Sequence, residues 1–256
     1  MYYINIYNIL TLYIIYKVIF SIMFKTIFCL SSLYLALFFS FYFVCFYSSD
    51  SLYNLIITTT GIQDIKYYAG FDLSYEDVKR IAYDLIEYLS CRSNVLDTTI
   101  QLPNGNTIFF YNQKALSHMQ DVRNIIYHLK LFAVISFIIN IISACFIYFL
   151  GITFDKLKKC YRKILLLFFI TIFILIIACI IDFHFVFILL HKILFKENTY
   201  IFAPNKEYII NLLPQNIFFT YAYRIISAML ILIVFIYILL SILEKVRKNY
   251  TCKENV

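Results

Sequence analysis

Long runs of apolar residues divide the chain into regions of different character. Four of these runs, at 27–47, 131–151, 164–190 and 225–243, contain almost no charged side chains. A helix needs about 20 apolar residues to cross the roughly 30 Å of hydrocarbon in a bilayer. The pattern therefore predicts about four transmembrane helices.

The segment 50–128, between the first and second runs, has the pattern of a folded domain. Ser74 and Asp77 have the spacing of a capping box, in which each side chain binds the backbone N–H of the other residue. Behind them, apolar residues recur at helical spacing while charged residues occupy the other face. The apolar positions are Val78, Ile81, Ala82, Leu85, Ile86 and Leu89. This predicts an amphipathic helix that ends near Ser90.

A β-hairpin is predicted next in the same segment. The stretches 98–103 and 106–111 are rich in β-formers and flank Asn104-Gly105. Asn-Gly favours a type I′ turn, which requires positive φ at both positions. A helix then starts with Asn112 as its N-cap and keeps one apolar stripe into the second span. Earlier in the segment, 52–60 is either a strand or a continuation of the first span.

The segment 192–224, between the third and fourth runs, is rich in aromatic residues. These are Phe195, Tyr200, Phe202, Phe218 and Phe219. Pro204 and Pro214 forbid one continuous helix through the segment. Aromatic side chains favour the headgroup zone of a bilayer, so a lid or a partly re-entrant loop is expected here.

Composition agrees with this pattern. The chain has 256 residues, of which 62% are hydrophobic and only 14% are charged. A soluble domain of this length cannot cover so much apolar surface. The predicted fold class is an all-α membrane protein with about four transmembrane helices, a small α+β extracytoplasmic domain between the first and second, and an aromatic outer loop between the third and fourth.

The distribution of the +7 net charge predicts the orientation. Basic residues gather in the loop 152–163 and the tail 244–256, and Lys25 precedes the first run. By the positive-inside rule these places face the cytoplasm, with both termini, which leaves 50–128 and 192–224 outside a cell membrane. Because the basic residues adjoin spans, no nucleic-acid partner is expected.

Residues 1–24 are also apolar, with Lys17 as an interruption. We expect an N-terminal extension that is either an interfacial helix or sequence upstream of a start at Met23, with a fifth span as the alternative. Of the 7 cysteines, only Cys91 lies in an outer segment, so no disulfide framework is expected. No cysteine pair has zinc-binding spacing.

The side chains suited to proton transfer are the 4 histidines, His118, His128, His184 and His191. All four fall on or near the predicted outer side, and the competing interpretation of each is a polar interfacial anchor. Asp182, within the third run, is an ionisable residue in a span and therefore a functional candidate. Metal binding through His118 with Asp121, or through His184 with His191, has no supporting motif, so neither a metal nor another cofactor is expected.

Two segments resemble a known family. Residues 116–123, Leu-Ser-His-Met-Gln-Asp-Val-Arg, resemble the H-M-x-D-V-[KR] motif of the lipoprotein intramolecular transacylases, which are bacterial four-span membrane proteins. The segment from His191 to Phe195, together with several positions that follow it, is similar to the second motif of that family. The chain departs from the family pattern at Ala115, Asn198, Tyr200 and Glu207. The further positions aligned with this motif are Asn198, Tyr200, Pro204, Glu207, Pro214, Phe218 and Phe219.

The resemblance implies transfer of the sn-2 acyl chain of a diacylglyceryl lipoprotein to the α-amino group of its N-terminal cysteine, giving a lyso-form lipoprotein. It implies that His118 is the base, with Asp121 orienting it, and that His191 stabilises the oxyanion or protonates the leaving oxygen. Supporting roles fall to Met119, Asn198, Tyr200 and Glu207. The implied partners are diacylglyceryl-modified lipoproteins and membrane lipids, and the implied site is at the outer leaflet.

Three other interpretations remain open. A membrane lipid or lipoprotein esterase could use the same histidines to activate water, and a non-enzymatic membrane protein could bind a partner through its outer domain. A channel or transporter is less well supported, because few polar residues lie in the spans. These are Asn140, Asp182 and His184. The oligomeric state stays open.

Overall fold

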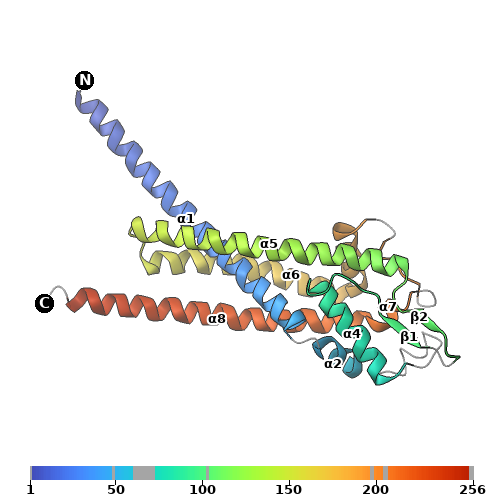
Figure 1. Cartoon of the computed structure of the whole chain (residues 1–256). Coiled ribbons are helices and arrows are strands. Elements are labelled where there is room, and N and C mark those ends of the chain that lie inside the picture. The colour runs from blue at the N-terminus through green and yellow to red at the C-terminus, as the bar shows by residue number, and fades with distance from the viewer. Residues whose placement is uncertain are drawn as a thin grey trace. The chain divides into compact units, whose positions relative to one another are not determined.

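The computed structural model describes residues 2–47, 50–59, 73–101, 104–196, 199–203 and 207–253. Helices dominate this part of the chain, and the elements are shown in Figure 1. In order they are α1 (Tyr2–Phe46), α2 (Asp50–Thr59), α4 (Tyr75–Leu89), β1 (Thr99–Gln101), β2 (Thr107–Phe109), α5 (Gln113–Phe149), α6 (Phe154–Leu194), α7 (Ile209–Leu212) and α8 (Gln215–Lys253).

Four helices in the described residues are long and apolar enough to cross a membrane. They are Thr11–Phe46, Gln113–Phe149, Phe154–Leu194 and Gln215–Val246. The predicted fold class is therefore confirmed. Their lengths of 32 to 41 residues exceed the roughly 20 needed for hydrocarbon, so each helix also extends beyond it.

The basic segments are helical rather than loops. α6 already begins at Phe154 and α8 continues to Lys253, so most of the predicted loop 152–163 and tail 244–256 belongs to helices. Lysine and arginine are good helix formers, and Leu157, Tyr161 and Leu165 bury one face of the first turns of α6. The predicted connection and tail are therefore largely helical, because charge density does not itself end a helix.

The turn between α5 and α6 is correspondingly short. Gly151 has φ +63°, and its N–H donates to the carbonyl of Tyr148. The N–H of Ile152 donates to the carbonyl of Ile147. These two bonds form a Schellman motif, which ends α5 at a glycine in the left-handed region.

α1 is one helix of 45 residues, from Tyr2 to Phe46. It has no interruption near residue 24, so residues 2–24 continue directly into the first predicted span. The expectation of a separate extension there, as an interfacial helix or as sequence upstream of a start at Met23, had rested on the residues around Met23. Helical propensity runs through this region because it contains neither glycine nor proline.

The chain forms two compact units. The first comprises Met1–Leu37, Phe132–Ile177 and Met229–Val256. Its core includes Cys29, Tyr161 and Met229 from three different helices. The Asn140 side-chain amide donates to the hydroxyls of Ser31 and Ser32, at 2.9 and 2.7 Å, so a polar contact joins α5 to α1 in this unit.

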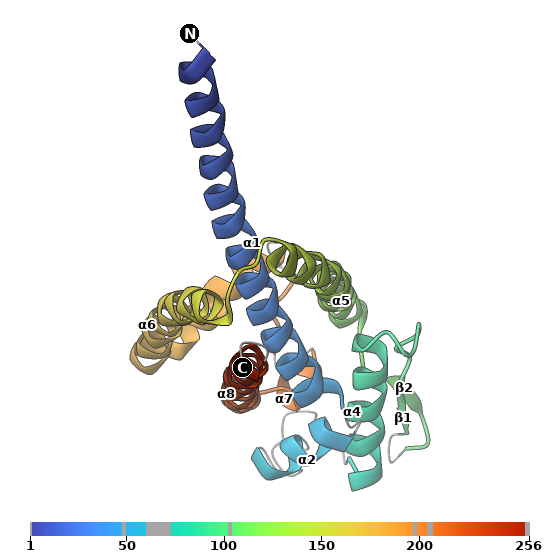
Figure 2. The ribbon, with the colours of Figure 1, turned by 90° about the vertical axis from the view of Figure 1, so that its left-hand side faces the viewer.

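The second unit comprises Phe38–Leu131 and Ala178–Ala228. Its core lies around α4, which packs against α2 (Figure 2). The buried residues of α4 are Val78, Ile81, Ala82, Leu85, Ile86 and Tyr88. Five of these were expected from the helical spacing. For residues 52–60 the sequence allowed either a strand or a continuation of the first span. The structure has residues 52–59 in helix α2.

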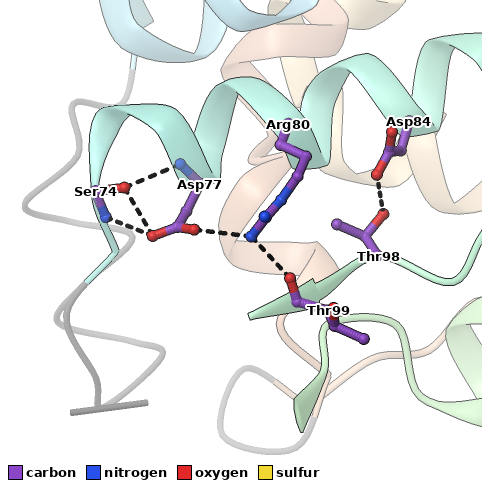
Figure 3. Close-up of polar contacts among 6 residues, drawn as sticks. All are labelled: Ser74, Asp77, Arg80, Asp84, Thr98 and Thr99. Atoms are coloured by element: carbon purple, nitrogen blue, oxygen red, sulfur yellow. Dashed lines mark hydrogen bonds and ion pairs between the residues drawn. The ribbon is translucent and has the colours of Figure 1, made fainter. Parts of the chain in front are cut away.

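Polar contacts cap the N-terminus of α4 and join the helix to β1 (Figure 3). The predicted capping box is present, since Ser74 Oγ accepts from the N–H of Asp77 and the Asp77 carboxylate accepts from the N–H of Ser74. Arg80 donates to Asp77 and to the carbonyl of Thr99, while Thr98 donates to Asp84 at 2.7 Å. Arg80 therefore extends the capping network to the hairpin.

The hairpin is present, but its turn differs from the prediction. The last pair is Gln101 with Thr107, which gives an odd number of loop residues. Gly105 has φ +84°, whereas Asn104 is not among the positive-φ residues. A type I′ turn needs positive φ at both Asn104 and Gly105, so the predicted type I′ turn was wrong. The Asn104 side chain instead accepts from the N–H of Asn106 at 3.0 Å.

The C-terminus of α4 places a cysteine where glycine is usual. Cys91 has φ 63°, and its N–H donates to the carbonyl of Tyr88. The N–H of Arg92 donates to the carbonyl of Glu87, which completes a Schellman motif. A side chain in the left-handed region costs roughly 1–2 kcal/mol. Cys91 therefore carries backbone strain that a glycine would not.

We expect Cys91→Gly to raise the free energy of unfolding by about 1 kcal/mol, because glycine adopts positive φ without a Cβ penalty. Reversible unfolding in mixed micelles measures the change. Cys91→Ala is the matched control, since it removes the thiol but keeps Cβ. A glycine variant no more stable than the alanine variant would show that no strain is stored there.

Candidate active site

His118 lies in the second turn of α5, within the second unit. The helix starts at the predicted N-cap, because the Asn112 side chain accepts from the N–H of Ala115 at 2.9 Å. Ala115 and Met119 belong to the core of the unit, so this face of the helix points inward. His118 is only 5% exposed. Its Nδ1 atom is buried without a hydrogen-bond partner.

His191 lies in the last turn of α6 and is half-buried. Its Nδ1 is 2.7 Å from the carbonyl oxygen of Phe187. A carbonyl only accepts, so Nδ1 carries the proton and donates it to this bond. In the neutral ring Nε2 therefore keeps its lone pair. This bond fixes both the tautomer and the orientation of the imidazole.

The structure brings these two imidazoles together. Their ring centroids are 6.1 Å apart and their planes differ by 25°. Both rings belong to the second unit, although 73 positions separate the residues in the sequence. At this separation both imidazoles can contact one small polar headgroup.

Aromatic side chains surround the pair. Phe195 contacts both, with its centroid 4.6 Å from His118 and 5.4 Å from His191. Phe202 lies edge-on to His118 at 5.4 Å. His191 has Phe187 at 4.1 Å and Tyr200 at 5.4 Å. The walls around the two imidazoles are therefore mainly apolar.

Glu207 and Lys114 hold the loop that carries Tyr200 and Phe202. The Glu207 carboxylate is buried and accepts from the N–H of Ala203 at 2.6 Å, while the N–H of Glu207 donates to the carbonyl of Ala203. Lys114 donates to the carbonyl of Ile201, and its ammonium lies 5.5 Å from the centre of the Phe202 ring. The loop is thus fastened to itself and to α5.

Neither imidazole has an acidic partner. Across the described ranges, no recorded ion pair includes His118 or His191. A charged imidazolium in an apolar surrounding loses hydration without compensation. The arrangement therefore suits two neutral rings, one with a free Nδ1 and the other with a free Nε2.

The remaining motif residues that the structure describes have different surroundings. Met119 is buried in the core. Asp121 is half-exposed, and no hydrogen bond to His118 is recorded for it, although both residues are described. Asn198 falls outside the described residues. The motif arginine, Arg123, does not contact the histidines; it donates to Asn94 at 2.7 Å and lies over the Tyr88 ring.

The other candidate histidines lie apart from the pair. His128 is exposed beside Tyr127. Nδ1 of His184 is 2.7 Å from the Gln215 side-chain amide. Asp182 interrupts the helical angles of α6. Among the described residues, no three metal-ligand side chains gather into a cluster.

Sequence reasoning missed Phe187 and Lys114. Phe187 precedes His191 by one helical turn, and that spacing could have identified it as the neighbour of the ring. Lys114 has the same relation to His118, but its contact with Ile201 depends on a loop path that local pattern does not predict.

The fold and the site define a class, namely an integral membrane protein with two imidazoles held close together among aromatic rings. A family model described as "Lipoprotein intramolecular transacylase Lit" matches residues 22–219. The chain belongs to this family of enzymes.

Solved structures of a bacterial member have the same fold. One chain of the membrane integral lipoprotein intramolecular transacylase from Bacillus cereus is 23% identical, with a TM-score of 0.66 over 88% of this chain and 98% of that one. A variant with one histidine replaced by alanine is 21% identical, with a TM-score of 0.67 over 92% and 98%. No curated protein matches the chain.

Glu207 provides a test of how the loop is held. We expect Glu207→Ala to lower the local stability of the loop by about 1–3 kcal/mol, because it removes a charged acceptor from a backbone N–H. Hydrogen exchange of peptides that cover 199–212 measures the change. Glu207→Gln keeps an oxygen acceptor, so the loop should lose much less local stability in this variant. Equal hydrogen exchange in the two variants would contradict the role of the Glu207 carboxylate in holding the loop.

Proposed function

We propose that this enzyme moves the sn-2 acyl chain of a diacylglyceryl-modified lipoprotein from its glycerol oxygen to the α-amino group of its N-terminal cysteine. The observation that carries the proposal is the 6.1 Å separation of the His118 and His191 rings. Two imidazoles at this distance can serve one small headgroup. The family supports a lipoprotein substrate.

The reaction needs no cofactor in principle. An amide is more stable than an ester, so the transfer is favourable. Amine and ester belong to the same molecule, and holding them in reactive geometry supplies much of the barrier reduction. The remaining requirements are proton transfers and stabilisation of the oxyanion.

His191 takes the first proton in this scheme. The α-ammonium group has an ordinary pKa of about 7.7–8.0 and must become neutral before it attacks. The free Nε2 of His191 accepts this proton, because its Nδ1–H is already bound to the carbonyl of Phe187. The resulting imidazolium then donates to the tetrahedral oxyanion.

His118 carries the second proton. After attack, the new C–N bond leaves a positive charge on nitrogen, and His118 removes one proton from it. It returns this proton to the glycerol oxygen as the C–O bond breaks. The buried, unpartnered Nδ1 of His118 supports this role, because it is an atom free to accept. The proton on His191 passes to water after the intermediate collapses.

The aromatic walls support the proposal in two ways. Phe195 and Phe202 keep bulk water from His118, which favours the amine over water as the nucleophile. An apolar surrounding also favours the neutral amine over the ammonium. Tyr200 shapes the wall beside His191. Glu207 keeps its loop in place, Met119 supports the His118 helix from the core, and Asp121 and Asn198 have supporting roles as family-motif positions.

The charge pattern supports a location for this site. Basic residues at 156–163 and 245–253 favour a cytoplasmic side for those helix ends and for both termini. His118 and His191 would then face the outer leaflet of the cell membrane, where the acyl chains can remain among membrane lipids. A membrane-impermeant lysine reagent that modified Lys158 in intact cells would contradict this orientation.

We expect His118→Ala and His191→Ala each to lower N-acylation at least about 100-fold, since general acid–base groups contribute about 10²–10⁴-fold. The enzyme is expressed in bacteria whose lipoproteins are diacylated, and mass spectrometry of their N-terminal peptides measures the product. His128→Ala is the matched control and should retain activity.

Retained activity in either His118→Ala or His191→Ala would remove that residue from the mechanism. The same spectra distinguish the esterase alternative, because hydrolysis leaves a free amine and releases fatty acid. A lyso-lipoprotein without an N-acyl group would therefore overturn the transfer reaction itself.

A further inference from the structure

α6 is interrupted just before the segment that carries His191. Asp182 has φ −154° and ψ 92°, which are extended angles inside an otherwise helical element. Residues 183–194 consequently form a helical segment with its own first turn. An interruption frees backbone N–H groups, which need new partners, above all in a low-dielectric surrounding.

The Asp182 side chain supplies one of these partners. Its Oδ1 accepts from the N–H of Phe185 at 2.9 Å. This is the geometry of an N-cap, in which an Asp or Asn side chain binds the N–H three residues ahead. Asp182 itself is exposed, and no contact with either site imidazole is recorded for it in the described ranges.

The capped segment docks on the beginning of α8. His184 is 2.7 Å from the Gln215 side chain, and the Phe183 ring is 5.8 Å from Phe219. One turn later, the Phe187 ring is 5.2 Å from Phe218. Three contacts within the first two turns therefore fix the direction and the rotation of this segment, and all of them belong to the second unit.

The same segment then orients His191. Phe187 accepts the His191 Nδ1–H at its carbonyl, and its ring lies 4.1 Å from the imidazole. A change in the rotation of the segment would move Phe187 and His191 together. The orientation of the catalytic ring therefore depends on where the segment begins.

We propose that Asp182 is a positioning residue, whose cap on residues 183–194 sets the orientation of His191 relative to His118. The proposal rests on the proposed acyl transfer, and it adds a residue that the family motifs do not contain. It also gives a role to an ionisable residue that the reaction itself does not use.

The test compares Asp182→Ala, which removes the cap, with Asp182→Asn, which retains an equally good one. Thr171→Val is the matched control, because it removes a polar side chain from the same helix outside the capped segment. We expect Asp182→Ala to lower kcat about 10- to 100-fold with KM nearly unchanged, since small misplacements of catalytic groups have effects of this size. Asp182→Asn and Thr171→Val should stay within about threefold of the parent enzyme.

Hydrogen exchange of peptides covering 183–194 provides a second measurement that does not depend on activity. We expect faster exchange in Asp182→Ala than in Asp182→Asn. If the Asp182→Ala enzyme is not obtained as folded protein, the Asp182→Glu enzyme takes its place in both measurements. Glutamate keeps the charge but places the carboxylate one methylene farther from the backbone N–H. It should behave like the alanine variant.

Two outcomes would overturn the proposal. One is unchanged kcat and exchange in the uncapped variant, and the other is an asparagine variant as impaired as alanine, which would assign the role to charge. If the parent enzyme forms no N-acyl product, the proposed function fails, while the exchange data still decide whether Asp182 caps the segment.

Discussion

An unsatisfied nitrogen in the core is the feature on which the site depends. Nδ1 of His118 is buried without a partner, although buried polar groups in native proteins nearly always have one. Such an atom costs about 1–3 kcal/mol. The imidazole is held there from two sides. One side is the core that includes Ala115 and Met119, and the other is formed by the rings of Phe195 and Phe202. Under the proposed function this nitrogen is free because it awaits a substrate proton.

Much of the fold could be predicted from local chemistry. The capping box at Ser74, the buried face of α4 and the N-cap at Asn112 follow from spacing over a single helical turn. The hairpin turn was not predictable in detail, because Asn-Gly fits more than one loop length. The apolar runs gave the spans but not the full helix lengths, because helices α6 and α8 include the flanking basic residues and lysine and arginine are good helix formers.

The site, like the fold, could be predicted from the sequence only in part. The two histidines could be named from their motifs, but no local rule predicts that rings 73 positions apart approach to 6.1 Å. That approach brings together the start of α5, the end of α6 and the 199–203 loop, which are distant in sequence. The motif arginine, Arg123, contacts Asn94 and Tyr88, so membership of the motif does not by itself place a side chain beside the histidines.

The central claim is that His118 and His191 act as one unit on one substrate headgroup. A double-variant kinetic cycle tests this most directly, with kcat/KM measured for His118→Ala, His191→Ala and the combination. Residues that act together are strongly non-additive, so the double variant should be about as slow as the slower single variant. Losses that multiply would show two independent contributions and would contradict the shared site.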